Sequence, residues 1–70
     1  MLPLSVADTG VELIIRKIGG SPEIKKHLED LGFTVGGSVS VVSKLGENVI
    51  VRVKESRIAI NDEMARRIMV

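Results

Sequence analysis

The feature that most constrains this chain is a run of alternating β-branched residues that a two-residue turn interrupts. The run reads SVSVVSKL, then Gly46-Glu47, then NVIVRVK, and it spans residues 38–54. Two such segments on either side of a short loop that contains glycine predict a β-hairpin. Side chains two residues apart in a strand share a face. One face therefore carries Val49, Val51 and Val53, and the other carries Ile50, Arg52 and Lys54.

Further strands are predicted on both sides of this hairpin. The segment VELIIRKI, residues 11–18, is rich in β-branched residues and carries aliphatic side chains on both faces. That pattern indicates either a kinked strand or a strand at the centre of the sheet. The C-terminal part adds a turn at Glu55-Ser56, a strand RIAI at 57–60, one helical turn over DEMA capped by Asn61, and a last strand RRIMV at 66–70.

The segment between the first predicted strand and the hairpin has the signals of a short helix, Pro22–Leu31. Ser21 is a suitable N-cap, and Pro22 suits the first helical position. Apolar residues recur at helical spacing and predict one buried stripe, which has to dock on the rest of the protein. We assign structural roles to the stripe residues Ile24, Leu28 and Leu31, to Gly32 as the C-terminal cap, and to Phe33, which packs the helix onto the sheet.

Together these segments predict a mostly β fold with one or two short helices. Five short strands with tight turns, and one helix after the first strand, describe a small, partly open β-barrel whose curling protects the sheet edges. A chain of 70 residues forms a single domain, residues 1–70, and has to bury its apolar surface efficiently. Phe33 is its only aromatic residue, so Val, Ile and Leu have to fill the core.

Composition and charge exclude several functional classes. Ten basic and nine acidic residues are scattered along the chain and give a net charge of +1, which is not the clustered basic footprint of a nucleic-acid binder. The apolar runs are too short for membrane insertion, and the N-terminus has no signal-peptide pattern. The lack of cysteine fits a reducing compartment. We therefore expect a soluble cytoplasmic protein.

The residue inventory offers no catalytic centre. His27 is the only histidine, and none of the serines stands in a nucleophile-elbow motif. Glu29-Asp30 and Asp62-Glu63 are adjacent acids, which point in different directions on a helix. The glycine pairs Gly19-Gly20 and Gly36-Gly37 match turns and not phosphate-binding loops. We expect no enzymatic activity.

One pair of residues has the spacing of metal ligands. Glu23 and His27 are four positions apart and share a face of the predicted helix. A third ligand would have to come from another segment, so the simpler interpretation is a helix-stabilising Glu–His pair. We expect no required cofactor, and we expect Fe²⁺ or another divalent transition metal to bind weakly, if it binds at all.

The charges of the predicted helix run against its dipole. Lys25 and Lys26 lie near the positive N-terminal end, whereas Glu29 and Asp30 lie near the negative C-terminal end. Ion pairs between residues four apart, Lys25–Glu29 and Lys26–Asp30, would offset part of this cost. One interpretation is an ordinary solvated face. The other is a docking surface for a partner protein, formed by Lys25, Lys26 and His27.

Four segments of the chain resemble the ferrous iron transport protein A family, FeoA, whose members are small SH3-like proteins that accompany the FeoB ferrous iron transporter. The segments are LPLSVADTG, IIRKIGG, HLEDLGFTVGGSVSVV and SRIAINDEMARRIMV, and they cover nearly the whole chain in the family's order. The most specific stretch is the pattern formed by Leu28, Leu31, Gly32, Phe33 and Gly36.

The chain departs from the family pattern at two positions, with His27 where a basic residue is common and Val35 where a proline is common. The resemblance implies an SH3-like barrel and a non-catalytic cytoplasmic accessory of ferrous iron uptake. Its implied partner is the FeoB-type transporter, contacted from the inner face of the membrane at the G-protein domain or the membrane domain. The change at His27 bears on those partner contacts.

Two other functions fit the same fold. One is the SH3-like C-terminal module of a metal-dependent transcriptional repressor, which would follow a DNA-binding helix-turn-helix domain. The chain starts at Met1 with a family-like LPLS and carries no such domain, so we prefer the free-standing accessory. The other is a general protein-interaction barrel.

Overall fold

The predicted hairpin forms the centre of the structure. The computed structural model describes all 70 residues, and in it β3 (Ser38–Leu45) pairs antiparallel with β4 (Asn48–Val53). The predicted turn at Gly46-Glu47 is confirmed, and Gly46 has a φ of 61°, which two-residue turns that begin with glycine require. The predicted valine face of β4 is buried. The hairpin thus supplies one wall of the core.

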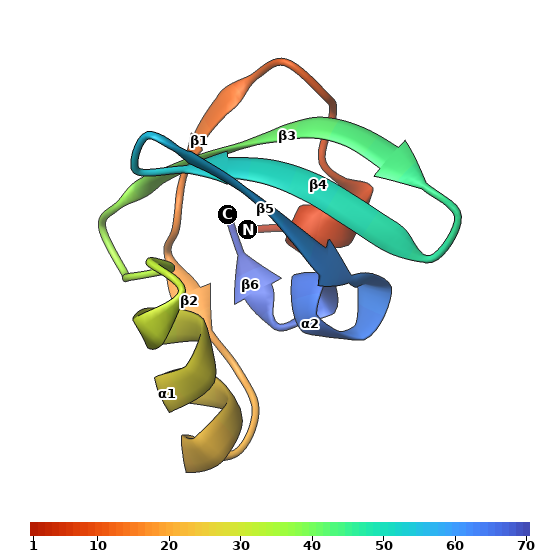
Figure 1. Cartoon of the computed structure of the whole chain (residues 1–70). Helices are drawn as coiled ribbons and strands as arrows, with labels where there is room; N and C mark the ends of the chain where they lie inside the picture. Colours follow the sequence, from red (N-terminus) through yellow and green to blue (C-terminus); the bar gives the residue numbers. More distant parts are fainter.

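The hairpin is extended on both sides into a four-stranded antiparallel sheet with the order β1-β3-β4-β5 (Figure 1). β1 (Glu12–Ile14) pairs with β3, and β5 (Ser56–Asn61) pairs with β4. A register shift between Val41 and Ser43 marks a β-bulge in β3. A bulge bends its strand and increases the local twist, so it helps this sheet to curl around the core.

The first predicted strand, residues 11–18, is broken into two. β1 ends at Ile14, and β2 (Lys17–Ile18) joins a second sheet. The predicted kink is therefore confirmed, while the alternative of a central strand is wrong because β1 is the outer strand of its sheet. The break also explains the aliphatic residues on both faces, since Leu13 packs on the core from one sheet and Ile18 from the other.

The second sheet brings the two ends of the chain together. β2 pairs with β6 (Ile68–Met69), which is shorter than the predicted strand. Beside β6, the N–H of Leu2 donates to the C=O of Val70 at 2.9 Å, and the N–H of Val70 donates to the C=O of Leu2 at 2.8 Å. Figure 1 shows the two termini side by side. The 3-10 helix η1 (Leu4–Val6) follows and places Leu4 in the core.

The predicted helix forms α1 (Pro22–Asp30), which projects away from both sheets in Figure 1. Ser21 is the N-cap as predicted, because its Oγ accepts a hydrogen bond from the N–H of Ile24 at 3.3 Å. The predicted stripe faces inward, with Leu28 fully buried and both Ile24 and Leu31 partly buried. The helix therefore touches the barrel along one side only.

The end of α1 fastens the helix to the sheet. The N–H of Gly32 donates to the C=O of Glu29, and the N–H of Phe33 donates to the C=O of Leu28, each at 2.9 Å. These are the two hydrogen bonds of a Schellman motif, which requires the positive φ of 108° at Gly32. Leu28 and Phe33 are both fully buried, so the hydrophobic contact that accompanies this motif belongs to the core.

The C-terminal elements follow the prediction with one shift. The turn before β5 is formed by Lys54 and Glu55 and not by Glu55-Ser56, since the β4–β5 register closes at Val53–Ser56. α2 (Asp62–Arg66) is capped as predicted, with the Asn61 Oδ1 accepting from the N–H of Met64 at 2.8 Å.

The two sheets enclose one core of 15 buried residues, none of them polar. Because no strand pairing joins β5 to the second sheet, the predicted small, partly open β-barrel with two short helices is confirmed, although it has six strands and not five. Neither α-helix has the length and apolar character that a membrane-spanning helix needs.

Candidate functional site

The predicted docking residues Lys25, Lys26 and His27 are all exposed on α1, but they do not share one face. Successive residues of an α-helix are separated by about 100°, so the three side chains spread over about 200° of the helix surface. Ile24 and Leu28 turn toward the core, which leaves Lys26 on the side farthest from the barrel. The predicted docking residues therefore cover the whole outward arc of α1, with His27 at one margin.

The charges on this arc do not neutralise one another. The predicted pairs Lys25–Glu29 and Lys26–Asp30 are not formed, because every ion pair in the structure lies on α2. With lysine N-terminal to the acid, the i,i+4 geometry is the weaker of the two orientations, and exposed pairs gain little. All four side chains remain available to an external partner.

Glu23 and His27, the predicted pair of metal ligands, lie exposed on one side of α1. The structure brings no further ligand to them, since it contains no group of three or more His, Cys, Asp or Glu residues placed to hold a metal ion. Protein zinc sites use three or four protein ligands. This pair alone is an incomplete donor set.

Gly36 belongs to the connection between α1 and β3. Its N–H donates to the C=O of Ile15 at 2.8 Å, and the N–H of Ile15 donates to the C=O of Gly37 at 2.9 Å. Gly36 has a φ of 91°, a conformation that favours glycine. This connection therefore holds the chain at the break between β1 and β2.

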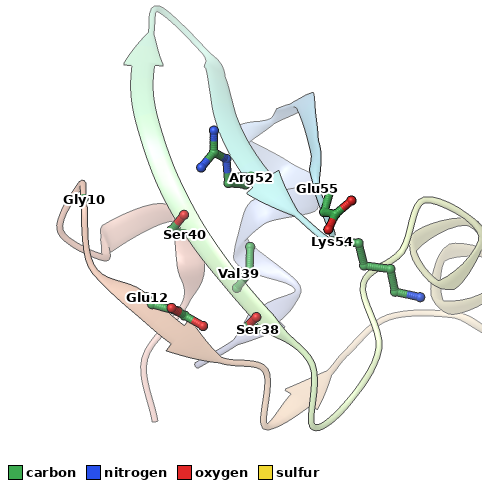
Figure 2. Close-up of a pocket in the computed structure, with 8 residues that line it drawn as sticks. All are labelled: Gly10, Glu12, Ser38, Val39, Ser40, Arg52, Lys54 and Glu55. Atoms are coloured by element: carbon green, nitrogen blue, oxygen red, sulfur yellow. The ribbon is translucent and has the colours of Figure 1, made fainter.

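The largest hollow of the surface crosses the outer face of β1, β3 and β4 (Figure 2). Ser40 of β3 lies opposite Glu12 of β1 on one side and opposite Arg52 of β4 on the other. Figure 2 shows Lys54 extending from the end of β4 toward α1. The hollow thus combines hydroxyl groups with charges of both signs. Its lining residues are Gly10, Glu12, Ser38, Val39, Ser40, Arg52, Lys54 and Glu55.

A second hollow lies beside α2 and has no unpaired cation. Arg66 pairs with Asp62 at 2.8 Å, and Arg67 lies 3.8 Å from Glu63. These four charges line the hollow together with Glu47 and Asn61. Because each arginine is paired with the acid four positions before it, this hollow has less charge to offer a ligand than the first.

The hollow on the sheet was missed at the sequence level, although part of its signal is visible there. The two-residue period places Arg52 and Lys54 on one face of β4 and would likewise place Ser38 and Ser40 on one face of β3. Glu12 also lines the hollow, because β1 pairs with β3 and places Glu12 opposite Ser40. This pairing joins residues that are far apart in the chain.

Several known proteins are similar to this chain. The family model of the FeoA domain matches residues 2–70. A Methanocaldococcus jannaschii protein that carries the name Fe(2+) transport protein A is 34% identical over 70 residues, which is all of this chain and 85% of that protein. Solved structures of FeoA proteins are similar to this chain as well.

A crystal structure of an iron uptake regulatory protein, FeoA, superposes with a TM-score of 0.89 at 29% identity and covers 97% of this chain and 90% of its own. Stenotrophomonas maltophilia FeoA, solved in complex with zinc and described as a procaryotic SH3 domain protein, gives a TM-score of 0.84 at 25% identity, over 99% of this chain and 88% of that one.

A manganese-dependent transcriptional repressor shares the fold alone, with a TM-score of 0.85 at 13% identity over 94% of this chain and 38% of the repressor. The barrel is thus SH3-like, as the resemblance implied. Since the FeoA domain model spans nearly the whole length of the chain, this protein belongs to the FeoA domain family.

Proposed function

We propose that this chain is a cytoplasmic, non-catalytic accessory of ferrous iron uptake that docks on a FeoB-type transporter. The observation that carries the proposal is the family match over residues 2–70, together with the 34% identity to a protein named for Fe(2+) transport. The ferrous ion is then cargo of the transporter. Calorimetric titration of the isolated chain with Fe²⁺ is expected to give only weak binding, because Glu23 and His27 are an incomplete donor set.

The outward arc of α1 supports docking as the mode of action. Lys25 and Lys26 are exposed, form no ion pair, and oppose the helix dipole. Glu23 in the first turn and His27 in the last turn suit the dipole, whereas the two lysines that follow Glu23 do not serve helix stability in this way. The observed order is understandable if these charges meet a complementary surface on the transporter.

The function of a repressor module remains the second candidate, and a specific comparison weakens it. The repressor that superposes on this chain shares 13% of its residues, against 34% for the transport protein. Similarity at 13% supports the fold, while the identity to the transport protein extends over the whole chain. The higher identity therefore supports the transport accessory as our proposal.

Binding between this chain and the cytoplasmic domain of the transporter from the same organism tests the proposal. Lys25→Glu with Lys26→Glu should weaken the complex, mostly through a slower association rate, and the loss should shrink as salt is raised. The free energy of unfolding should stay equal or rise by a few tenths of a kcal/mol, because acids suit the positive end of the helix.

The matched control is Lys17→Glu with Lys44→Glu, which changes the net charge equally at two exposed strand positions. An equal loss of affinity in both double variants would mean that net charge alone sets the affinity. The interface would then not involve α1. Wild-type chain that fails to bind the transporter domain at any salt concentration would contradict the docking function itself.

A further inference from the structure

One edge of the four-stranded sheet is open along its whole length. β5 (Ser56–Asn61) is an outermost strand and pairs with β4 alone. None of the 16 backbone hydrogen bonds made outside helices and strands involves residues 56–60. Figure 1 shows β4 along one side of β5, while β6, on its other side, belongs to the second sheet and does not pair with β5. The strand therefore presents unpaired backbone groups.

The turn before β5 decides which backbone groups these are. Val53 and Ser56 close a two-residue loop, so they form a hydrogen-bonded pair of the antiparallel ladder. Hydrogen-bonded pairs alternate along a strand, so Ile58 also turns its backbone to β4. The N–H and C=O groups of Arg57 and Ala59 then point to the open edge.

This edge lacks the usual protection against pairing. β5 contains no proline, its register with β4 shows no bulge, and Arg57 is its only charged residue. The opposite outer strand, β1, is only three residues long, which is itself a protective feature. A six-residue edge strand with two buried or half-buried isoleucines is by contrast a suitable template for an added strand.

The charges beside the edge indicate what kind of strand it would accept. Arg52 and Arg57 lie directly opposite one another on β4 and β5, and both are exposed. Like charges in this arrangement repel, and no ion pair in the structure relieves them. Lys54 adds a third cation at the adjoining turn, where Glu55 is the one acid; Glu12 is two strands away from Arg52.

A second copy of the chain is a poor occupant for this edge. Pairing two β5 strands antiparallel would bring both sets of Arg52 and Arg57 into one continuous sheet and increase the repulsion. We propose that the open edge of β5 binds an extended acidic segment of a partner protein as an added antiparallel strand. An acid of that segment that lies opposite Arg57 pairs with it, and Arg52, one strand farther away on β4, adds to the positive charge that the acids meet. This surface is separate from the arc of α1, and the inference does not depend on which protein α1 contacts.

Amide hydrogen exchange of the free chain, followed by NMR, tests the edge first. The amides of Arg57 and Ala59 should exchange rapidly, and those of Ile58 and Ile60 should be protected. The probe is a synthetic capped peptide, Thr-Glu-Val-Glu-Val-Glu-Thr, compared with the same peptide carrying Lys in place of Glu. At nine-tenths occupancy, the acidic peptide should slow exchange at Arg57 and Ala59 about tenfold.

Three results would overturn the inference. The first is equal protection by the acidic and basic peptides, which would exclude recognition of charge. The second is a lack of protection by the acidic peptide at about 1 mM, because the dissociation constant would then be too high for specific recognition. The third is protection that rises with protein concentration without any peptide, which would assign the edge to a second copy.

Two sets of variants separate backbone pairing from charge. Ala59→Pro removes the outward N–H and leaves the β4 ladder intact, so it should abolish peptide protection at Arg57 while Ala59→Thr, which keeps the N–H, retains it. Arg52→Glu with Arg57→Glu should reverse the preference toward the lysine peptide. The charge reversal leaves the backbone unchanged, so it tests recognition of charge even if the proline variant does not fold. A double variant that still prefers the acidic peptide contradicts the inference.

Discussion

Lys54 and Glu55 are the only non-glycine residues with positive φ, at 54° and 32°. A two-residue hairpin turn with two positive φ values favours Asn-Gly, because other side chains meet a steric cost there. Glu55→Gly should therefore raise the free energy of unfolding by about 0.5–1 kcal/mol, even though glycine gains more freedom in the unfolded chain. Urea denaturation followed by circular dichroism measures this change.

The control for this residue is Glu47→Gly in the other hairpin. Glu47 holds the equivalent second position of a two-residue turn, but its φ is not positive. Glycine relieves no strain there, so Glu47→Gly should lower stability by about 0.5–1 kcal/mol. If both variants shift stability in the same direction, backbone strain at Lys54 and Glu55 is not the explanation.

At the scale of elements, α1 depends on a narrow attachment. Leu28 is its one fully buried residue and also supplies the C=O that Phe33 bonds in the helix cap. Leu28→Ala should cost about 2–5 kcal/mol, because it leaves a cavity between the helix and the barrel. Ile24→Ala should cost clearly less, since Ile24 is only partly buried.

Thermal and urea unfolding of both variants measure the difference between the two sites. A loss below about 0.5 kcal/mol for Leu28→Ala would mean that α1 is not packed as described. Unfolding of α1 alone, with the strands intact, would appear as loss of amide protection confined to residues 22–30.

For the whole molecule, the pairing of the chain ends closes the second sheet. Met69 and Val70 take part in three backbone hydrogen bonds to Leu2 and Arg16, and Val70 is buried. Removing Met69-Val70 should cost roughly 3–4 kcal/mol from these bonds and the lost apolar burial. For a chain of this size, that loss lowers Tm by about 12–30 °C.

Differential scanning calorimetry measures this shift, with Leu45→Ser as the control. Leu45 is 69% exposed at the tip of the first hairpin, so its replacement should leave Tm almost unchanged. A truncated chain that melts within a few degrees of the full one would show that the second sheet adds little to the stability of the barrel.

The candidate site could be predicted only in part. The exposed charges of α1 follow from the helix pattern, and the outward position of Arg52 and Lys54 follows from the period of the strand. Which charged residues form ion pairs does not follow from the sequence. Lys25 and Glu29 have ion-pair spacing and form no ion pair. Exposed side chains choose among several rotamers, so spacing alone does not decide their contacts.

Elements whose signals are local could be read directly from the amino-acid sequence. The alternating valines, the Gly46 turn, the Ser21 and Asn61 caps and the Gly32 helix end were all visible there, because each depends on residues within a few positions of one another. The break of residues 11–18 into two sheets, the pairing of the chain ends and the open edge of β5 are established by the folded chain alone. These features depend on which distant segments pair, and local propensity carries no information about a partner strand that lies tens of residues away.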